Sequence, residues 1–264
     1  MKFFLDSHGL RQFCVTSVRD PCYDKKERGG DKEMKEHIYI AEDEKEIREM
    51  VKTFLMSEGY EVSDFSTGDA LFEKFLQNEP DLVILDVLMP GSSGFDITKK
   101  IRERSTVPII ILTARDSDLD YATGINLGSD DYFTKPFSAI SLVMRVKAML
   151  RRVRLDQENL KEKEEENLSF STLSVNPGTM EVLLEGKVLE LTPTEFRLLS
   201  YLVKNSDRAV SRTELLDEVW GYSIEVETRA CDDTVRRLRK KLSSSNIWID
   251  NIWGFGFRIM EDES

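Results

Sequence analysis

From residue 37 onward, short runs of apolar residues alternate with stretches in which apolar residues recur at helical spacing. Short apolar runs predict strands over 38–42, 61–65, 82–86, 107–112 and 131–135. Between and after them, apolar residues at helical spacing predict helices near 44–58, 70–77, 94–104, 117–127 and 138–154. Such an alternation predicts an α/β fold with a doubly wound, five-stranded parallel sheet and right-handed crossovers.

The pattern changes after residue 167. Residues 168–192 predict short strands around two turn signals, Asn176-Pro177-Gly178 and Glu185-Gly186. Three further helices are expected at 193–204, 211–220 and 228–243. The first begins with the capping-box residues Thr192 and Glu195. The last segment, 248–259, predicts a hairpin turned by glycine, so a second domain of different architecture follows the first.

These patterns divide the chain into four parts. We expect a disordered extension over 1–35, an α/β domain over 36–154, an acidic linker over 155–167 and a second domain over 168–262. The linker has almost no apolar residues, which indicates a solvated segment that in part continues the preceding helix.

Length and composition limit the class of protein. With 264 residues the chain has room for two domains with separate cores. No apolar run approaches the ~20 residues of a membrane helix, so no membrane partner is expected. The three cysteines, Cys14, Cys22 and Cys231, lack the spacing of a metal site. They favour a reduced compartment, and therefore the cytoplasm.

Chemically functional side chains follow four of the predicted strands. Glu42 and Asp43 come after the first strand, and Asp86 closes the apolar run 82–85. Thr113 and Lys135 follow the last two strands. Since ligand sites form at the carboxyl ends of parallel strands, we expect these side chains to lie together.

This set of side chains suits metal-assisted phosphate chemistry. Three crowded carboxylates repel one another, and a divalent cation such as Mg²⁺ would keep them ionised. Asp86 could then act as a nucleophile and form an acyl phosphate, with Lys135 and the Thr113 hydroxyl near the transferred group. Singly, a strand-end Asp is often only a cap, and a Lys there is usually a surface residue. The occurrence of all five at successive strand ends argues against coincidence.

A basic segment opposes the net charge of −12. Residues 229–241 hold six Lys and Arg against two Asp. On a helix, Cys231, Val235, Leu238 and Leu242 share the core face. The opposite, solvent-facing side would carry Arg229, Asp233, Arg236, Arg237 and Lys240. Such a helix is a plausible reader of the DNA major groove, whereas a lone basic helix is more often only a solvated face.

The first domain resembles the receiver domain of bacterial response regulators. The resemblance rests on Ile40–Glu44, Leu85–Gly91, Leu112–Ala114 and Gly128–Phe137. It implies that Asp86 accepts phosphate from a sensor histidine kinase. It also implies that Mg²⁺ is held by Glu42, Asp43, Asp86 and the backbone carbonyl of Leu88. Thr113 would turn toward the phosphate and let the Tyr132 ring swing inward.

The second domain resembles the winged helix-turn-helix effector of OmpR/PhoB-type regulators. The matching segments are Leu191–Leu199, Val210–Leu216, Val219-Trp220, Arg229–Leu242 and Gly254–Phe257. The resemblance implies DNA phosphate contacts from Trp220, Arg229, Thr234, Arg236 and Arg239, and base contacts from Asp232, Asp233 and Arg237. Lys240 extends the same basic side. The loop 221–227 would meet RNA polymerase. Asp233 stands where an apolar residue is usual, and we hypothesise that it selects a cytosine.

In this family, phosphorylated receivers pair through their fourth helix, fifth strand and fifth helix. Here that surface would set Asp130 and Asp131 against Arg145, Lys147 and Arg151 across a homodimer. The expected function is a phosphorylation-activated transcriptional regulator of a two-component system that binds promoter DNA and is not an enzyme.

Two alternatives stay open. One is a DNA-binding regulator that is independent of phosphorylation and uses its receiver only for dimerisation. The other is a metal-dependent phosphohydrolase with an Asp nucleophile, although such enzymes usually place a second carboxylate two residues later, where this chain has Leu88.

Overall fold

The computed structural model describes residues 35–114, 128–162, 167–222 and 228–262. The predicted helix 117–127 and almost all of the expected extension lie outside these ranges. From Lys35 onward the chain forms one unit, in which both predicted domains are present.

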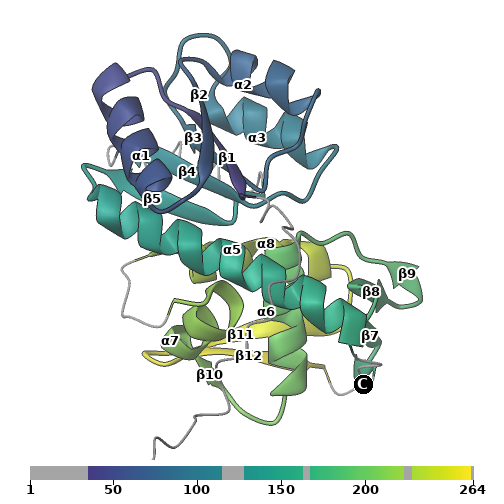
Figure 1. Ribbon diagram of the computed structural model, residues 1–264. Helices are drawn as coiled ribbons and strands as arrows, with labels where there is room; N and C mark the ends of the chain where they lie inside the picture. Colours follow the sequence, from purple (N-terminus) through teal and green to yellow (C-terminus); the bar gives the residue numbers. More distant parts are fainter. Residues whose placement is uncertain (1–34, 115–127, 163–166, 223–227, 263–264) are drawn as a thin grey trace, which may run out of the picture. The chain divides into compact units, whose positions relative to one another are not determined.

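The first domain holds the predicted parallel sheet (Figure 1). Its strands are β1 (His37–Ala41), β2 (Glu61–Phe65), β3 (Leu82–Asp86), β4 (Ile109–Ala114) and β5 (Asp131–Lys135). They lie in the order β2-β1-β3-β4-β5, and every neighbouring pair is parallel. The order reverses between β1 and β3, so the carboxyl ends of these two strands border the crevice where ligands bind in open α/β sheets.

Helices cover both faces of this sheet (Figure 1). They are α1 (Lys45–Ser57), α2 (Gly68–Phe75), α3 (Gly94–Arg102) and α5 (Ala139–Glu162). Successive strand residues point to opposite faces. Ile38 and Ile40 therefore join the core beneath α1 and α5, whereas Tyr39 and Ala41 join the core beneath α2 and α3.

Helix α5 is longer than the sequence predicted. It was expected to end near residue 154, but it continues to Glu162. Residues 155–162 lack an apolar face but include Leu, Gln, Glu and Lys, which are strong helix formers. The low hydrophobicity of this segment indicates exposure to solvent, but it does not end the helix.

The second domain begins with a four-stranded antiparallel sheet. Its strands are β6 (Leu168–Phe170), β7 (Leu173–Asn176), β8 (Glu181–Leu184) and β9 (Lys187–Val188). Next come α6 (Pro193–Lys204), β10 (Val210–Ser211), α7 (Arg212–Leu215), the π-helical segment η2 (Leu216–Trp220), α8 (Ala230–Leu242), β11 (Ile247–Ile252) and β12 (Gly256–Glu261). β12 lies between β10 and β11 in a small antiparallel sheet.

Local signals fixed most of these helices. The capping box of α6 is present, because the Thr192 and Glu195 side chains each accept a hydrogen bond from the other residue's backbone N–H. The predicted core stripe of α8 is buried at all four positions, Cys231, Val235, Leu238 and Leu242. The predicted helix 211–220 is instead divided into α7 and η2.

Candidate functional site

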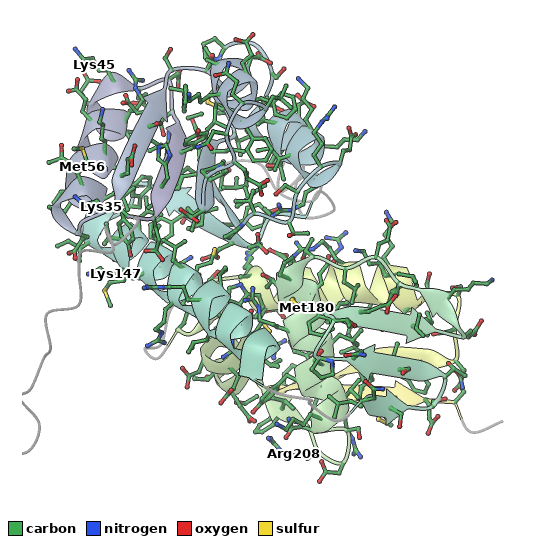
Figure 2. The ribbon with its side chains drawn as sticks, turned by 45° about the vertical axis from the view of Figure 1, so that its right-hand side comes forward. Lys35, Lys45, Met56, Lys147, Met180 and Arg208 are labelled. Atoms are coloured by element: carbon green, nitrogen blue, oxygen red, sulfur yellow. The ribbon has the colours of Figure 1, made fainter. Side chains whose placement is uncertain are left out.

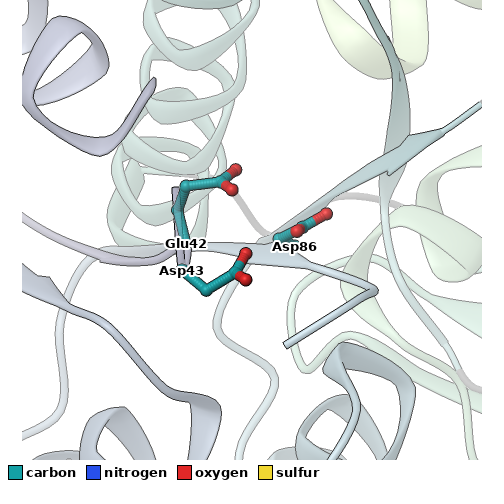
Figure 3. Close-up of side chains that lie close together, drawn as sticks. All are labelled: Glu42, Asp43 and Asp86. Carbon is teal, nitrogen blue, oxygen red and sulfur yellow. The ribbon is translucent and has the colours of Figure 1, made fainter. Parts of the chain in front are cut away.

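The predicted acidic cluster forms at the ends of β1 and β3. Glu42, Asp43 and Asp86 each offer a carboxylate oxygen, and these oxygens lie within 4.8 Å of one another (Figure 3). Parallel pairing of β1 with β3, with Ala41 opposite Leu85, brings the following residues together. Glu42 and Asp86 are buried, whereas Asp43 is exposed to solvent.

Lys135, from the end of β5, neutralises the buried part of this cluster. Its Nζ lies 2.8 Å from Glu42 Oε1 and 3.1 Å from Asp86 Oδ2. Burial raises the pKa of both carboxyls, and Lys135 opposes that rise. Burial also acts to lower the pKa of Lys135, but Glu42 and Asp86 outweigh it and the pKa is raised. The ammonium therefore stays charged between two carboxylates that are costly to ionise.

The cluster has the chemistry of a site for a hard divalent cation. Its donors are all oxygen, the ligand type that Mg²⁺ prefers, and they include no thiolate or imidazole. Oε2 of Glu42 is buried and has no hydrogen-bond partner within the described ranges. Buried polar atoms are nearly always satisfied, so this oxygen fits a role toward a bound ion or its water.

Close packing fixes the backbone that carries Asp86. A Cβ at Gly94 would lie 2.1 Å from the Asp86 carbonyl oxygen, so the first residue of α3 must be glycine for this approach. The Gly94 N–H donates to Val87 O at 3.1 Å. Ser93 and Asp96 form a capping box at the same helix end. Asp86 is thus presented on a rigid support.

The other predicted residues of the first domain border this end of the sheet. Asp86 pairs with Leu112, so Thr113 lies one residue further along the neighbouring strand. Its hydroxyl donates to the Ala114 carbonyl at 3.2 Å. Leu88 follows Asp86 by two residues, with its side chain exposed. Tyr132, on β5, is buried, and burial first of all raises its pKa to about 12.

The predicted DNA-facing side of α8 is only partly exposed. Arg229, Asp232, Arg236, Arg239 and Lys240 are exposed. Asp233 and Arg237 were predicted to face solvent, which was wrong: both are buried, together with Thr234.

Arg237 has a buried partner that the helical pattern did not reveal. Its Nε donates to Glu195 Oε1 on α6 at 2.8 Å, and its Nη2 donates to Thr234 Oγ1 at 3.0 Å. Lys241 Nζ lies 2.7 Å from the other oxygen of Glu195. Glu195 was expected only to cap α6; its contact with α8 spans 42 residues of sequence and had no local signal.

Trp220, expected to contact DNA, is also buried. Its indole N–H donates to the backbone carbonyl of Asp130 at 2.9 Å. Asp130 and Asp131 were expected to face Arg145, Lys147 and Arg151 of a second chain. Within the chain, Arg145 pairs with Asp131, and Lys147, which is labelled in Figure 2, pairs with Glu58. Arg151 donates to the Gly221 carbonyl.

Most of the loop 221–227, expected to meet RNA polymerase, lies outside the described residues. Over the residues that are described, no helix combines the length and apolarity needed to cross a bilayer.

Fold and site together define a signalling regulator with an acidic receiver site and a DNA-binding output domain. Residues 38–147 match the model of the response regulator receiver domain, and residues 186–259 match that of the transcriptional regulatory protein, C terminal. The chain belongs to the OmpR/PhoB-type response regulators of two-component systems, which are transcriptional regulators and not enzymes.

Similar proteins support this assignment over both domains. The chain is 40% identical over 227 residues to the uncharacterized transcriptional regulatory protein YclJ of Bacillus subtilis, covering 85% of this chain and 99% of that one. It is 39% identical over 230 residues to the regulatory protein VanR of Enterococcus faecium, covering 86% and 99%. A structure of a RitR mutant shares the fold, with a TM-score of 0.66 at 24% identity over 86% of this chain and all of the other.

Proposed function

We propose that Asp86 takes a phosphoryl group from a sensor histidine kinase with the help of Mg²⁺, and that this promotes dimerisation and promoter binding. The observation that carries the proposal is the buried cluster of Glu42, Asp43 and Asp86, with Lys135 within 3.1 Å of Asp86. Its strand-end position is where an open α/β sheet binds ligands.

In the proposed reaction, a carboxylate oxygen of Asp86 attacks the phosphorus of a phosphohistidine. The P–N bond breaks, the imidazole departs and Asp86 becomes an acyl phosphate. Glu42, Asp43, Asp86 and the Leu88 carbonyl would hold Mg²⁺, which stabilises charge on the transferred group when bound. Lys135 keeps a positive charge beside the same oxygens. On β4, Thr113 follows Leu112, the residue that pairs with Asp86, and its hydroxyl would turn toward the phosphoryl group.

The DNA-binding output domain would dock α8 in the major groove. Arg236, Arg239 and Lys240 are already exposed and suited to DNA phosphates, and exposed Asp232 is suited to a base edge. Arg229 is exposed as well, whereas Trp220, Asp233, Thr234 and Arg237 are buried and are proposed contacts that would first have to become accessible. Promoter DNA and RNA polymerase are the proposed partners, in the cytoplasm.

The direct test is phosphorylation with acetyl phosphate. With Mg²⁺, the intact protein should gain the mass of one phosphoryl group, and Asp86→Asn should gain none. Asp81→Asn, at the opposite end of β3, is the matched control and should react like the parent chain. Labelling of Asp86→Asn, or labelling that survives chelation of the metal, would contradict the proposal.

The two alternatives give different results. A regulator that is independent of phosphorylation would show the same DNA footprint for Asp86→Asn and for the phosphorylated parent chain. A phosphohydrolase would turn over a phosphomonoester such as p-nitrophenyl phosphate many times per chain. We expect neither result.

A further inference from the structure

A cavity of about 230 Å³ lies between the C-terminal half of α5 and the second domain. Its lining comes from α5, β6, the turn between β7 and β8, α6 and η2. None of the described residues that line it belongs to the acidic cluster or to the proposed DNA contacts. A role for this cavity would therefore be separate from both.

Part of the lining is apolar and suits a small organic group. Phe196 and Val219 are buried, and Leu168 and Met180 are partly buried against the same core. A dry cavity of ~150 Å³ can hold benzene, whereas drug-sized ligands occupy pockets of ~300–1,000 Å³. This cavity lies between these sizes, so it suits a molecule a little larger than benzene.

Three polar side chains of the lining indicate hydrogen-bond acceptors on that molecule. Arg152 Nε, Arg197 Nε and Ser200 Oγ are buried and have no hydrogen-bond partner within the described ranges. Arg197 is 8% exposed, and its other two nitrogens donate to Asp156 at 2.6 Å and to Thr194 at 3.0 Å. Buried polar atoms are nearly always satisfied. The position of these three atoms in one cavity therefore indicates a ligand that accepts hydrogen bonds.

The charges of the lining indicate that this ligand is an anion. Two guanidinium groups share Asp156, whose carboxylate lies 2.6 Å from Arg197 Nη1 and 3.7 Å from Arg152 Nε. Burial lowers the pKa of Arg197, which Asp156 opposes and the charge of Arg152 reinforces. Lys204 and Glu218, both exposed, add opposite charges to the lining. Water could satisfy the hydrogen bonds, but an anion would also neutralise the second guanidinium group.

We propose that this cavity is a binding site for a small organic carboxylate, with the apolar body of the ligand against Phe196 and Met180. Arg152, Arg197 and Ser200 bind its carboxylate, because the planar guanidinium group matches the geometry of a carboxylate. The single surplus cation favours a singly charged carboxylate over a phosphate group. The site goes beyond the proposed function, since it depends neither on phosphorylation nor on DNA.

Benzoate is the probe, because it joins one carboxylate to an apolar ring of the required size. Isothermal titration calorimetry on the full chain should give a Kd of about 0.1–1 mM, the range expected for so small a ligand. Benzamide keeps the ring and the shape but lacks the charge, so it should bind at least about tenfold more weakly. Inorganic phosphate lacks the apolar body and should also bind more weakly than benzoate.

Two variants remove donors from the site. Arg152→Met deletes one guanidinium group, and Ser200→Ala deletes the hydroxyl. Each should weaken benzoate binding about tenfold, the loss expected for one hydrogen bond to a carboxylate. Ser200→Ala keeps the test open if Arg152→Met folds poorly. Arg154→Met is the matched control and should bind like the parent, because this α5 arginine pairs with Glu36 and does not line the cavity.

The methyl group of Met180 locates the bound ligand. In protein with isotope-labelled methionine methyl groups, the ring of benzoate should shift the nuclear magnetic resonance signal of Met180. Met180→Leu identifies that signal among the nine methionines of the chain. Shifts confined to other methionines would place benzoate outside this cavity and overturn the proposal.

The calorimetric results decide the rest. Binding that is absent at ~10 mM benzoate, that benzamide equals, or that is unchanged in both Arg152→Met and Ser200→Ala would overturn the site. Tighter binding of phosphate than of benzoate would overturn the assignment of an organic ligand. Weaker binding in the two donor variants, with parent-like binding in Arg154→Met and a shifted Met180 signal, would support it.

Discussion

Replacing Glu195 with Gln should destabilise the second domain far more than its single lost charge suggests. The side chain is 1% exposed, and it binds Arg237 at 2.8 Å and Lys241 at 2.7 Å. Gln keeps the shape and can still accept the hydrogen bond from the Thr192 N–H. The variant therefore isolates the effect of leaving the buried Arg237 charge without this carboxylate.

The expected magnitude follows from burial on both sides. Arg237 has a 5% exposed side chain, and removing one member of a buried ion pair typically costs ~3–5 kcal/mol. Arg237 keeps its contact with Thr234, so we expect about 3 kcal/mol, or about 6–12 °C in Tm for a chain of this size. The control Glu214→Gln breaks the more exposed pair with Arg208 and should cost less than ~1 kcal/mol.

The pH dependence has a definite sign. Burial alone would raise the pKa of Glu195, but Arg237 and Lys241 outweigh it and hold the pKa below that of an ordinary glutamate. The contribution of Glu195 is therefore full above the unfolded-state pKa and is lost as pH falls through the folded-state pKa. Urea unfolding, followed by circular dichroism, should show a large difference from the parent at pH 7 that shrinks in acid. A difference at pH 7 no larger than that of Glu214→Gln would refute the reasoning.

Three further changes test the site and the DNA-facing helix. Asp86→Asn should raise Tm by about 2–4 °C in metal-free buffer, because burial raises the pKa of Asp86 and its ionisation then costs stability above the unfolded-state pKa. Scanning calorimetry with and without Mg²⁺ measures this change. An unchanged Tm without metal would count against the prediction. Gly94→Ala should lower the free energy of unfolding by at least ~2 kcal/mol, because its Cβ would lie 2.1 Å from the Asp86 carbonyl oxygen. It should also slow the labelling of Asp86 by acetyl phosphate. Unfolding in urea like that of the parent chain would contradict this prediction. Lys240→Ala should lower the slope of log K against log salt by about 0.9 in DNA anisotropy titrations, and an unchanged slope would exclude Lys240 from phosphate contact.

Much of the fold was predictable because its signals are local. Apolar runs fixed β2, β3 and β5 to the residue, and the Thr192–Glu195 pair fixed the start of α6. The acidic cluster was predictable for a topological reason: Glu42 and Asp86 end strands that lie next to each other only because the order reverses between β1 and β3. Residue type and position at the strand ends were together enough to predict that these two carboxylates lie close to each other.

The burial of Arg237 and Asp233 was not predictable, because helical periodicity cannot show what covers a polar face. The buried partner of Arg237 is Glu195, which lies 42 residues away in the sequence. An exposed basic helix and a covered one have the same pattern, and only the tertiary structure distinguishes them.

The hydrogen bonds of Asp131 limit how this residue could take part in the proposed dimer. Oδ1 accepts from Tyr132 N–H and Thr228, and Oδ2 accepts from Arg145 and Tyr222. A carboxylate has about four acceptor positions, so all are filled within one chain. A second subunit can gain a contact with Asp131 only where an internal donor leaves.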